Sequence, residues 1–201
     1  PDLLPSDLTG INFYHQKTEE FEFRRGPLFS SMILADEINR ATPRTQSALL
    51  EAMEEKQITV DGTTYPMASP FMVMATQNPI ESYGTFPLPE AQMDRFFMRI
   101  SIGYPTIEQE MDVLERYSGV VKPMATIEPV CTAQDIIALQ EMVKQVYCSP
   151  EVRMYVATLV AATRQEPALA LGASTRAAIA LIHGAQACAL LAGRDYIIPE
   201  D

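Results

Sequence analysis

The sequence predicts an α/β domain built on a parallel sheet, followed by an all-helical domain. Two continuous apolar runs, at residues 32–35 and 71–76, have the length of strands and are separated by an amphipathic helix. Such runs are typical of parallel strands that are buried on both faces. After Pro105 the apolar residues recur only at helical spacing. We therefore expect an α/β domain over residues 1–104 and a helical domain over residues 105–201.

The composition excludes several classes of function. The chain has 26 acidic against 15 basic residues, for a formal net charge of −11. Nucleic-acid grooves need clustered Lys and Arg, so this charge argues against nucleic-acid binding. No apolar run approaches the ~18 residues that a membrane span requires. Cys131, Cys148 and Cys188 are far apart in the sequence, so we expect them to stay reduced in the core of a cytoplasmic protein.

Two β-hairpins are expected in the first domain. The first ten residues carry Pro and Ser-Asp turn signals and are expected to form a loop. Residues 11–14 and 20–24 then form two short strands with alternating aromatic and charged side chains. Residues 57–60 and 63–66 form the second hairpin, because the Asp-Gly pair between them is the strongest short hairpin signal.

Helix start signals place the remaining elements. Thr42 can cap a helix that begins at Pro43, with leucines on its core side and Glu51, Glu54 and Glu55 facing water. A short helix then carries Asp94 and Arg95, and residues 96–102 form a third apolar run that we expect to be a strand. In the second domain, helices should follow four capping residues, the first helix covering residues 107–117: Thr106, Thr132, Ser149 and Ser174.

Polar side chains follow both apolar runs. Asp36 and Glu37 follow the first run and Asn78 follows the second. Open α/β sheets bind ligands at the carboxyl ends of their strands, so these three side chains should lie together there. An apolar strand ending in Asp-Glu is the Walker B arrangement of P-loop NTPases, in which Asp36 would hold Mg²⁺ and Glu37 would polarise the attacking water. The alternative is that the two acids cap a surface turn and that Asn78 is an ordinary turn residue.

Short motifs of one family occur in order along the chain, at residues 1–10, 34–41, 46–55, 60–62, 75–80, 88–96 and 172–177. Through these motifs the sequence resembles the MoxR family of AAA+ ATPases over nearly its whole length. The resemblance implies a P-loop NTPase core with a helical lid, ATP and Mg²⁺ as cofactors, and a hexameric ring. It further implies chaperone-like remodelling of a client protein complex, often beside a von Willebrand factor A domain protein.

The resemblance also implies a role for each polar residue. Asp36 and Glu37 match Walker B, and Asn78 matches sensor 1. Arg95 matches the arginine finger, which reaches the phosphates of a neighbouring subunit, and Arg176 resembles sensor 2 of the lid. A surface ion pair is the alternative for both arginines, and for Arg176 especially, because the helix dipole disfavours a cation in the first turn. The two hairpins would correspond to surfaces that face the central pore or the substrate.

One family motif is missing from the chain. It contains no Gly-x-x-x-x-Gly-Lys-Ser/Thr, the loop that cradles the phosphates, which in the family precedes the first residue here. We therefore expect a piece of a longer ATPase, truncated on the N-terminal side of its sheet. In the family the missing Walker A strand lies between the strands at residues 71 and 96, so this piece alone should bind no ATP and leave strand edges open. A nucleotide-free AAA+-like scaffold and a pure interaction module are the alternatives.

Overall fold

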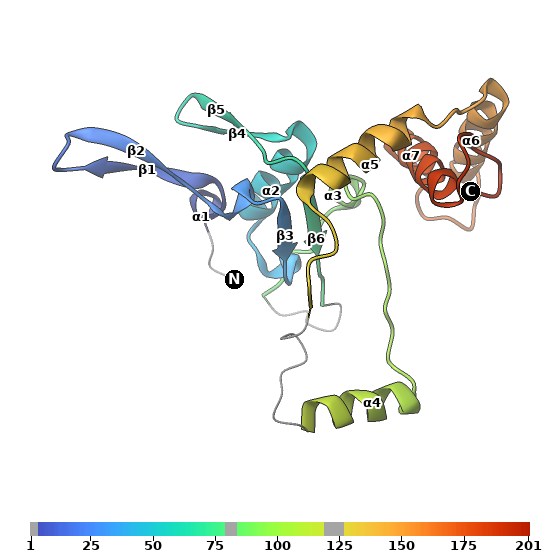
Figure 1. Cartoon of the computed structure of the whole chain (residues 1–201), viewed down its shortest axis with the longest axis horizontal. Helices are drawn as coiled ribbons and strands as arrows, with labels where there is room; N and C mark the ends of the chain where they lie inside the picture. Colours follow the sequence, from blue (N-terminus) through green and yellow to red (C-terminus); the bar gives the residue numbers. More distant parts are fainter. Residues whose placement is uncertain (1–3, 79–83, 119–126) are drawn as a thin grey trace.

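The computed structural model describes residues 4–78, 84–118 and 127–201. Figure 1 shows the hairpins at one end of the molecule and the last two helices, over residues 150–191, at the other. The elements, in order, are α1 (Pro5–Thr9), β1 (Gly10–His15), β2 (Glu20–Arg25), η1 (Pro27–Phe29), β3 (Met32–Ala35), η2 (Ile38–Arg40), α2 (Pro43–Glu55), β4 (Gln57–Val60), β5 (Thr63–Pro66), β6 (Met72–Ala75), α3 (Glu90–Met93), α4 (Ile107–Ser118), α5 (Ala133–Gln145), α6 (Pro150–Thr163) and α7 (Thr175–Leu191).

The parallel sheet predicted from the two apolar runs is present. Strands β3 and β6 pair in parallel, with Ala35 opposite Ala75, and α2 lies between them in the sequence. The core of this part is apolar and includes Leu28, Leu50 and Leu88. Helix α2 begins as expected, because Thr42 accepts a hydrogen bond from the Thr45 N–H and Pro43 occupies the first helical position.

The strands are not buried on both faces, which corrects the prediction. Ile33 and Val73 point to the core face and pack against the apolar cluster. The side chains that alternate with them are between 45% and 65% exposed, since no described element covers that face. The bare face of the sheet is formed by Met32, Leu34, Met72 and Met74.

Residues 96–102 do not form a strand, which is a second correction. A strand requires a neighbour to pair its backbone groups, and in the described part of the chain β3 and β6 pair only with each other. Phe96 still packs against the core, but the apolar side chains that follow it lie in the open, with Ile100 at 74% and Ile102 at 94% exposure. The preceding short helix, α3, ends at Met93, so Asp94 and Arg95 lie just after it rather than within it.

Both predicted hairpins are present and contact each other. Asp61 and Gly62 have φ values of 48° and 80°, the left-handed pair that a tight two-residue hairpin turn requires. Asn12 of the first hairpin donates a hydrogen bond of 2.5 Å to Asp61 of the second. The ring of Phe23 stacks on Tyr65, with ring centroids 4.3 Å apart. The two hairpins thus project side by side from the same end of the molecule (Figure 1).

The N-terminal segment is helical where a loop was expected. Helix α1 covers Pro5–Thr9, with proline at its first position. The Asp7 carboxylate accepts the Leu4 N–H at 2.8 Å, which satisfies a backbone donor at the helix start. The Pro and Ser-Asp signals therefore start a helix here and do not form an open turn. Residues 1–3 lie outside the described residues.

In the C-terminal part, α5, α6 and α7 pack together around Val146, Ala189 and Ile197. The predicted caps are present. For example, the Thr132 N–H and hydroxyl donate to Asp135, and these bonds lower the pKa of that carboxyl. No helix in the described residues is long and apolar enough to cross a membrane.

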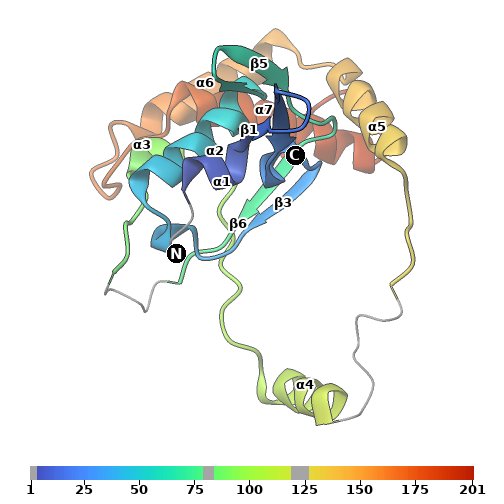
Figure 2. The same cartoon turned by 90° about the vertical axis from the view of Figure 1, so that its left-hand side faces the viewer.

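Helix α4 does not join this bundle, contrary to expectation. It covers Ile107–Ser118, one residue more than expected, and its capping box is present, because Thr106 and Gln109 each accept the other's backbone N–H. However, every residue of the helix is exposed, and Figures 1 and 2 both show it far from the other elements. Its apolar side has no partner among the described residues. The free cysteines also differ from expectation, because Cys131 and Cys188 are exposed and not in the core.

Candidate functional site

The end of β3 continues directly into the two predicted acids. Glu37 has φ 51° and ψ 51°, a left-handed backbone that is uncommon for any residue other than glycine. Its N–H donates to Thr76 Oγ1 at 2.8 Å, and the same hydroxyl donates to Asp36 Oδ1 at 2.6 Å. Thr76, at the end of β6, therefore joins both acids to the neighbouring strand. Strained backbone of this kind persists where the surrounding contacts enforce it and is concentrated at functional sites.

The next turn brings the backbone of Asn78 beside the segment that follows β3. The Ile38 N–H donates to the Thr76 carbonyl at 3.0 Å, and Asn39 Nδ2 donates to the Asn78 carbonyl at 3.2 Å. These two hydrogen bonds thus join the segment that follows β3 to the segment that follows β6. We refer to Asp36, Glu37, Thr76 and Asn78 as the strand-end group.

A buried glutamine holds the backbone next to the strand-end group in place. Gln46 of α2 is 2% exposed, and its Nε2 lies within hydrogen-bond distance of three backbone carbonyls, those of Ile38, Ala41 and Phe86. The sequence pattern did not indicate a role for Gln46 or Thr76. The signal for Gln46 was available, because it lies on the apolar side of its helix, three residues before Leu49.

The strand-end group offers oxygen ligands that suit Mg²⁺. Asp36 supplies a carboxylate and Thr76 a hydroxyl, both hard oxygen donors. Within the described residues no three His, Cys, Asp or Glu side chains cluster as a metal site. A single carboxylate fits a Mg²⁺ ion that takes its other ligands from water and phosphate, as this ion commonly does. The Glu37 carboxylate makes an ion pair with Arg40, in which Oε2 lies 3.2 Å from Nη1.

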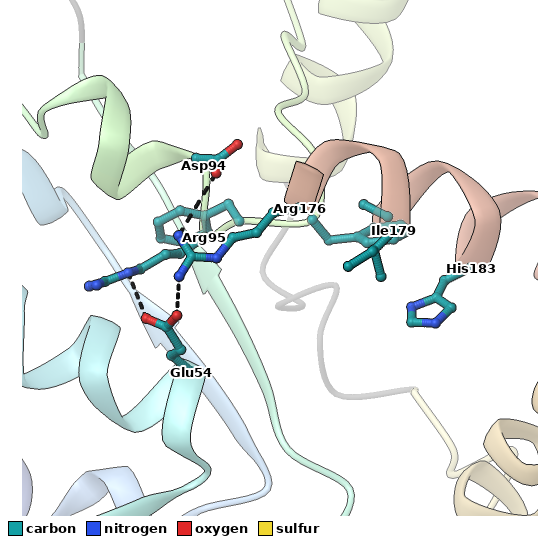
Figure 3. A pocket seen from close by; sticks show the side chains of 9 residues that line it. Glu54, Asp94, Arg95, Arg176, Ile179 and His183 are labelled. Atoms are coloured by element: carbon teal, nitrogen blue, oxygen red, sulfur yellow. Dashed lines mark hydrogen bonds and ion pairs between the residues drawn. The ribbon is translucent and has the colours of Figure 1, made fainter. Parts of the chain in front are cut away.

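The two predicted arginines meet at a different place, around Glu54 (Figure 3). Arg95 Nε lies 2.9 Å from Glu54 Oε2, and Arg176 Nη2 contacts Glu54 Oε1. Arg176 Nη1 also lies 3.9 Å from Asp94 Oδ2. We refer to Glu54, Asp94, Arg95 and Arg176 as the Glu54 group. The helical pattern of α2 predicts that Glu54 faces water, so its position between two arginines could not be seen from that pattern.

A hydrogen bond also connects this group to the start of α7. Asp94 Oδ1 accepts the Ser174 hydroxyl at 2.7 Å, while Ser174 Oγ accepts the Ala177 N–H at 3.1 Å and so caps α7. The same serine therefore starts the helix and attaches it to the segment that carries Arg95.

The structure does not bring the arginines to the acids of the strand ends. The hollow beside the Glu54 group is lined by both arginines, with His183 and Ile179 on its α7 side, and by neither Asp36 nor Glu37. An arginine that serves a neighbouring subunit is expected to lie apart from its own acids. Arg176, as it lies here, makes the ion pair that was the alternative to a phosphate contact.

Comparisons with known proteins identify the family and the fold. The family described as "ATPase family associated with various cellular activities (AAA)" matches residues 1–98, and the family described as "AAA lid domain" matches residues 161–201. Over the whole of this chain, the sequence is 53% identical to the YeaC protein of Bacillus subtilis and 45% identical to "Chaperone MoxR1" of Mycobacterium tuberculosis. "Protein MoxR" of Paracoccus denitrificans is 28% identical.

A solved structure shares the fold. The crystal structure of a candidate ATPase from Cytophaga hutchinsonii matches the whole chain with a TM-score of 0.87 and 45% sequence identity. The chain covers 63% of that protein, and 62%, 55% and 65% of the three curated relatives. It therefore spans less than two thirds of the length of these relatives.

Proposed function

Because the chain belongs to the MoxR family of AAA+ ATPases, we propose that the protein containing it binds ATP with Mg²⁺ and hydrolyses it to drive chaperone-like remodelling of protein complexes. The observation that carries the proposal is the strand-end group, in which Thr76 fixes Asp36 and Glu37 at the carboxyl edge of two parallel strands. That edge is where sheets of this class bind their ligands.

Each member of the strand-end group has a proposed role. Asp36, with the Thr76 hydroxyl beside it, would hold Mg²⁺, which when bound neutralises charge on the phosphates. Glu37 would accept a proton from the attacking water, and Asn78 would help to place that water. The left-handed backbone of Glu37 supports this role, because it fixes the start of the side chain relative to Asp36.

Arg95 is proposed to act on the nucleotide of a neighbouring subunit in a hexameric ring. Its Nη atoms donate no hydrogen bond to any residue that the structure describes, which leaves them available to a phosphoryl group outside the chain. A guanidinium there would stabilise the charge that develops during transfer. Arg176 is proposed as the lid residue that contacts the nucleotide, which requires it to leave the ion pair with Glu54.

The remaining proposals concern the partners of the protein and its location in the cell. The paired hairpins expose aromatic side chains such as Phe13 and Phe21, the latter 73% exposed, and we assign them to contact with a client protein or the pore. A von Willebrand factor A domain protein is the proposed companion, and the cytoplasm the proposed location.

The test of the function uses the full-length protein with Glu37→Gln. Since Glu37 is placed to activate water and not to hold nucleotide, ATP affinity should stay within about twofold while turnover falls by roughly 10²- to 10⁴-fold. Isothermal titration and a phosphate-release assay measure the two quantities. Glu51→Gln is the matched control, because Glu51 makes no ion pair with any described residue. Near-normal turnover in Glu37→Gln would reject the assignment.

A further inference from the structure

We propose that Glu54 is a positioning residue, which holds Arg95 at Nε and ties it to Arg176 of α7, so that the lid helix sets where the free end of Arg95 points. The inference rests on the proposed ATPase function and on the role proposed there for Arg95. It adds to that function a carboxylate through which the lid acts on the arginine.

The contact between Glu54 and Arg95 leaves the terminal nitrogens of the arginine available. Glu54 Oε2 lies 2.9 Å from Nε, and no hydrogen bond joins Glu54 to the terminal nitrogens. The Nε–H does not point along the line to the oxygen, and it finds no hydrogen-bond acceptor among the described residues. Figure 3 shows the end of the guanidinium extending past Glu54. Glu54 therefore steers Arg95 by charge while the nitrogens that would contact a phosphate remain available.

Glu54 uses its two oxygens for two arginines. Oε2 faces Arg95 and Oε1 faces Arg176, so one anion lies between two cations. If the carboxylate were neutral, the two guanidinium groups would lose the anion between them and keep only Asp94, 3.9 Å from Arg176 Nη1, so their repulsion would move them apart. The side chains are 31% exposed for Arg95, 33% for Glu54 and 50% for Arg176, so solvent weakens the attraction and the arrangement can adjust.

The group joins parts of the chain that are distant in sequence. Glu54 lies near the end of α2, and Arg176 lies 122 residues later in the first turn of α7. The bond from Ser174 to Asp94 holds the same helix to the residue next to Arg95. A movement of α7 must therefore move the charges around Arg95. Glu54 itself cannot serve the phosphates, because a carboxylate would repel them.

The experiment compares Glu54→Gln, Glu54→Asp and Glu51→Gln in the full-length protein, each with and without Arg95→Ala. With Arg95 present, Glu54→Gln should lower kcat by roughly tenfold to a hundredfold, the size expected for a misplaced catalytic group, and leave KM within about twofold. Glu54→Asp should recover part of the loss, and Glu51→Gln should match the wild type. In the Arg95→Ala background, Glu54→Gln should cause no further loss.

A second measurement does not depend on activity. Hydrogen exchange of the peptide over residues 174–183 should be several-fold faster in Glu54→Gln than in the wild type, and unchanged in Glu51→Gln. Wild-type turnover in Glu54→Gln, alongside a clear loss in Arg95→Ala, would overturn this inference and leave the ATPase function standing. An equal further loss in the Arg95→Ala background would also overturn it, because Glu54 would then act independently of Arg95. Absence of ATP hydrolysis in the wild type would reject the proposed function, and unchanged exchange would separately reject the tie to α7.

Discussion

The strand-end group and the Glu54 group use similar side chains, but the fold holds them together in different ways. In the strand-end group, Asp36 and Thr76 each follow a strand, and the pairing of β3 with β6 brings them into contact. In the Glu54 group, side chains from α2, the segment after α3 and the start of α7 meet. The hydrogen-bonded pairing of β3 with β6 thus fixes the first group. The second group depends on how α7 is placed relative to α2 and the segment after α3.

This difference suits the work proposed for each group. Proton abstraction from water requires a carboxylate held in one place, and the left-handed Glu37 with its buried support provides that. An arginine that serves another subunit must respond to the state of the ring. Partly exposed ion pairs such as those of Glu54 are weak enough to rearrange.

The largest expected effect is that of Arg95→Ala on turnover. If Arg95 supplies the cation that stabilises the transferred phosphoryl group, kcat in the assembled protein should fall by about 10³-fold or more while ATP binding persists. Arg99→Ala is the control, since it removes an exposed arginine from the same segment. A loss of similar size in both variants, or none in Arg95→Ala, would remove the distinction between the two groups.

An intermediate effect is expected for Gln46→Leu, which tests the support of the strand-end group. The substitution leaves buried carbonyls, including that of Ile38, without their donor and should lower the stability of the fold by about 1–3 kcal/mol. Chemical denaturation measures this loss, and turnover should fall with it because Ile38 adjoins Glu37. Gln140→Leu, on the exposed side of α5, should change the stability little. Equal stability in the two variants would show that Gln46 does not hold this frame.

The smallest effect is expected for Ser174→Ala, which tests the attachment of α7. Removing an N-cap hydroxyl costs about 1 kcal/mol, and Ser149→Ala removes the equivalent cap of α6. Only Ser174 also bonds Asp94, so Ser174→Ala should cost more, by about 0.5–1.5 kcal/mol. Identical losses in the two thermal unfolding curves would mean that this bond adds nothing to the stability.

Much of the local structure followed from the sequence for identifiable reasons. The hairpin turn at Asp61, the caps at Thr132 and Ser149, and the parallel pairing of the two apolar runs all depend on a few neighbouring residues. The position of Asp36 and Glu37 followed for the same reason, because a strand end fixes where the next residues lie.

What depends on distant contacts could not be predicted. Glu54 has the pattern of a water-facing residue, and only the tertiary fold places two arginines beside it. The segment over residues 96–102 has the composition of a strand, but strand formation requires a partner, which the described residues do not provide. The exposed face of β3 and β6 and the isolated α4 differ from expectation for the same reason, because burial is set by the neighbours that cover an apolar surface.

The central claim is that Glu37 and Arg95 complete one site from two different subunits. Mixed rings of Glu37→Gln and Arg95→Ala subunits test it most directly, because a junction between the two variants restores one intact site. We predict that the mixture hydrolyses ATP faster than either variant alone, with a maximum at intermediate ratios. If mixed rings form, as native mass spectrometry would show, and their turnover does not exceed that of either variant, the shared site is contradicted.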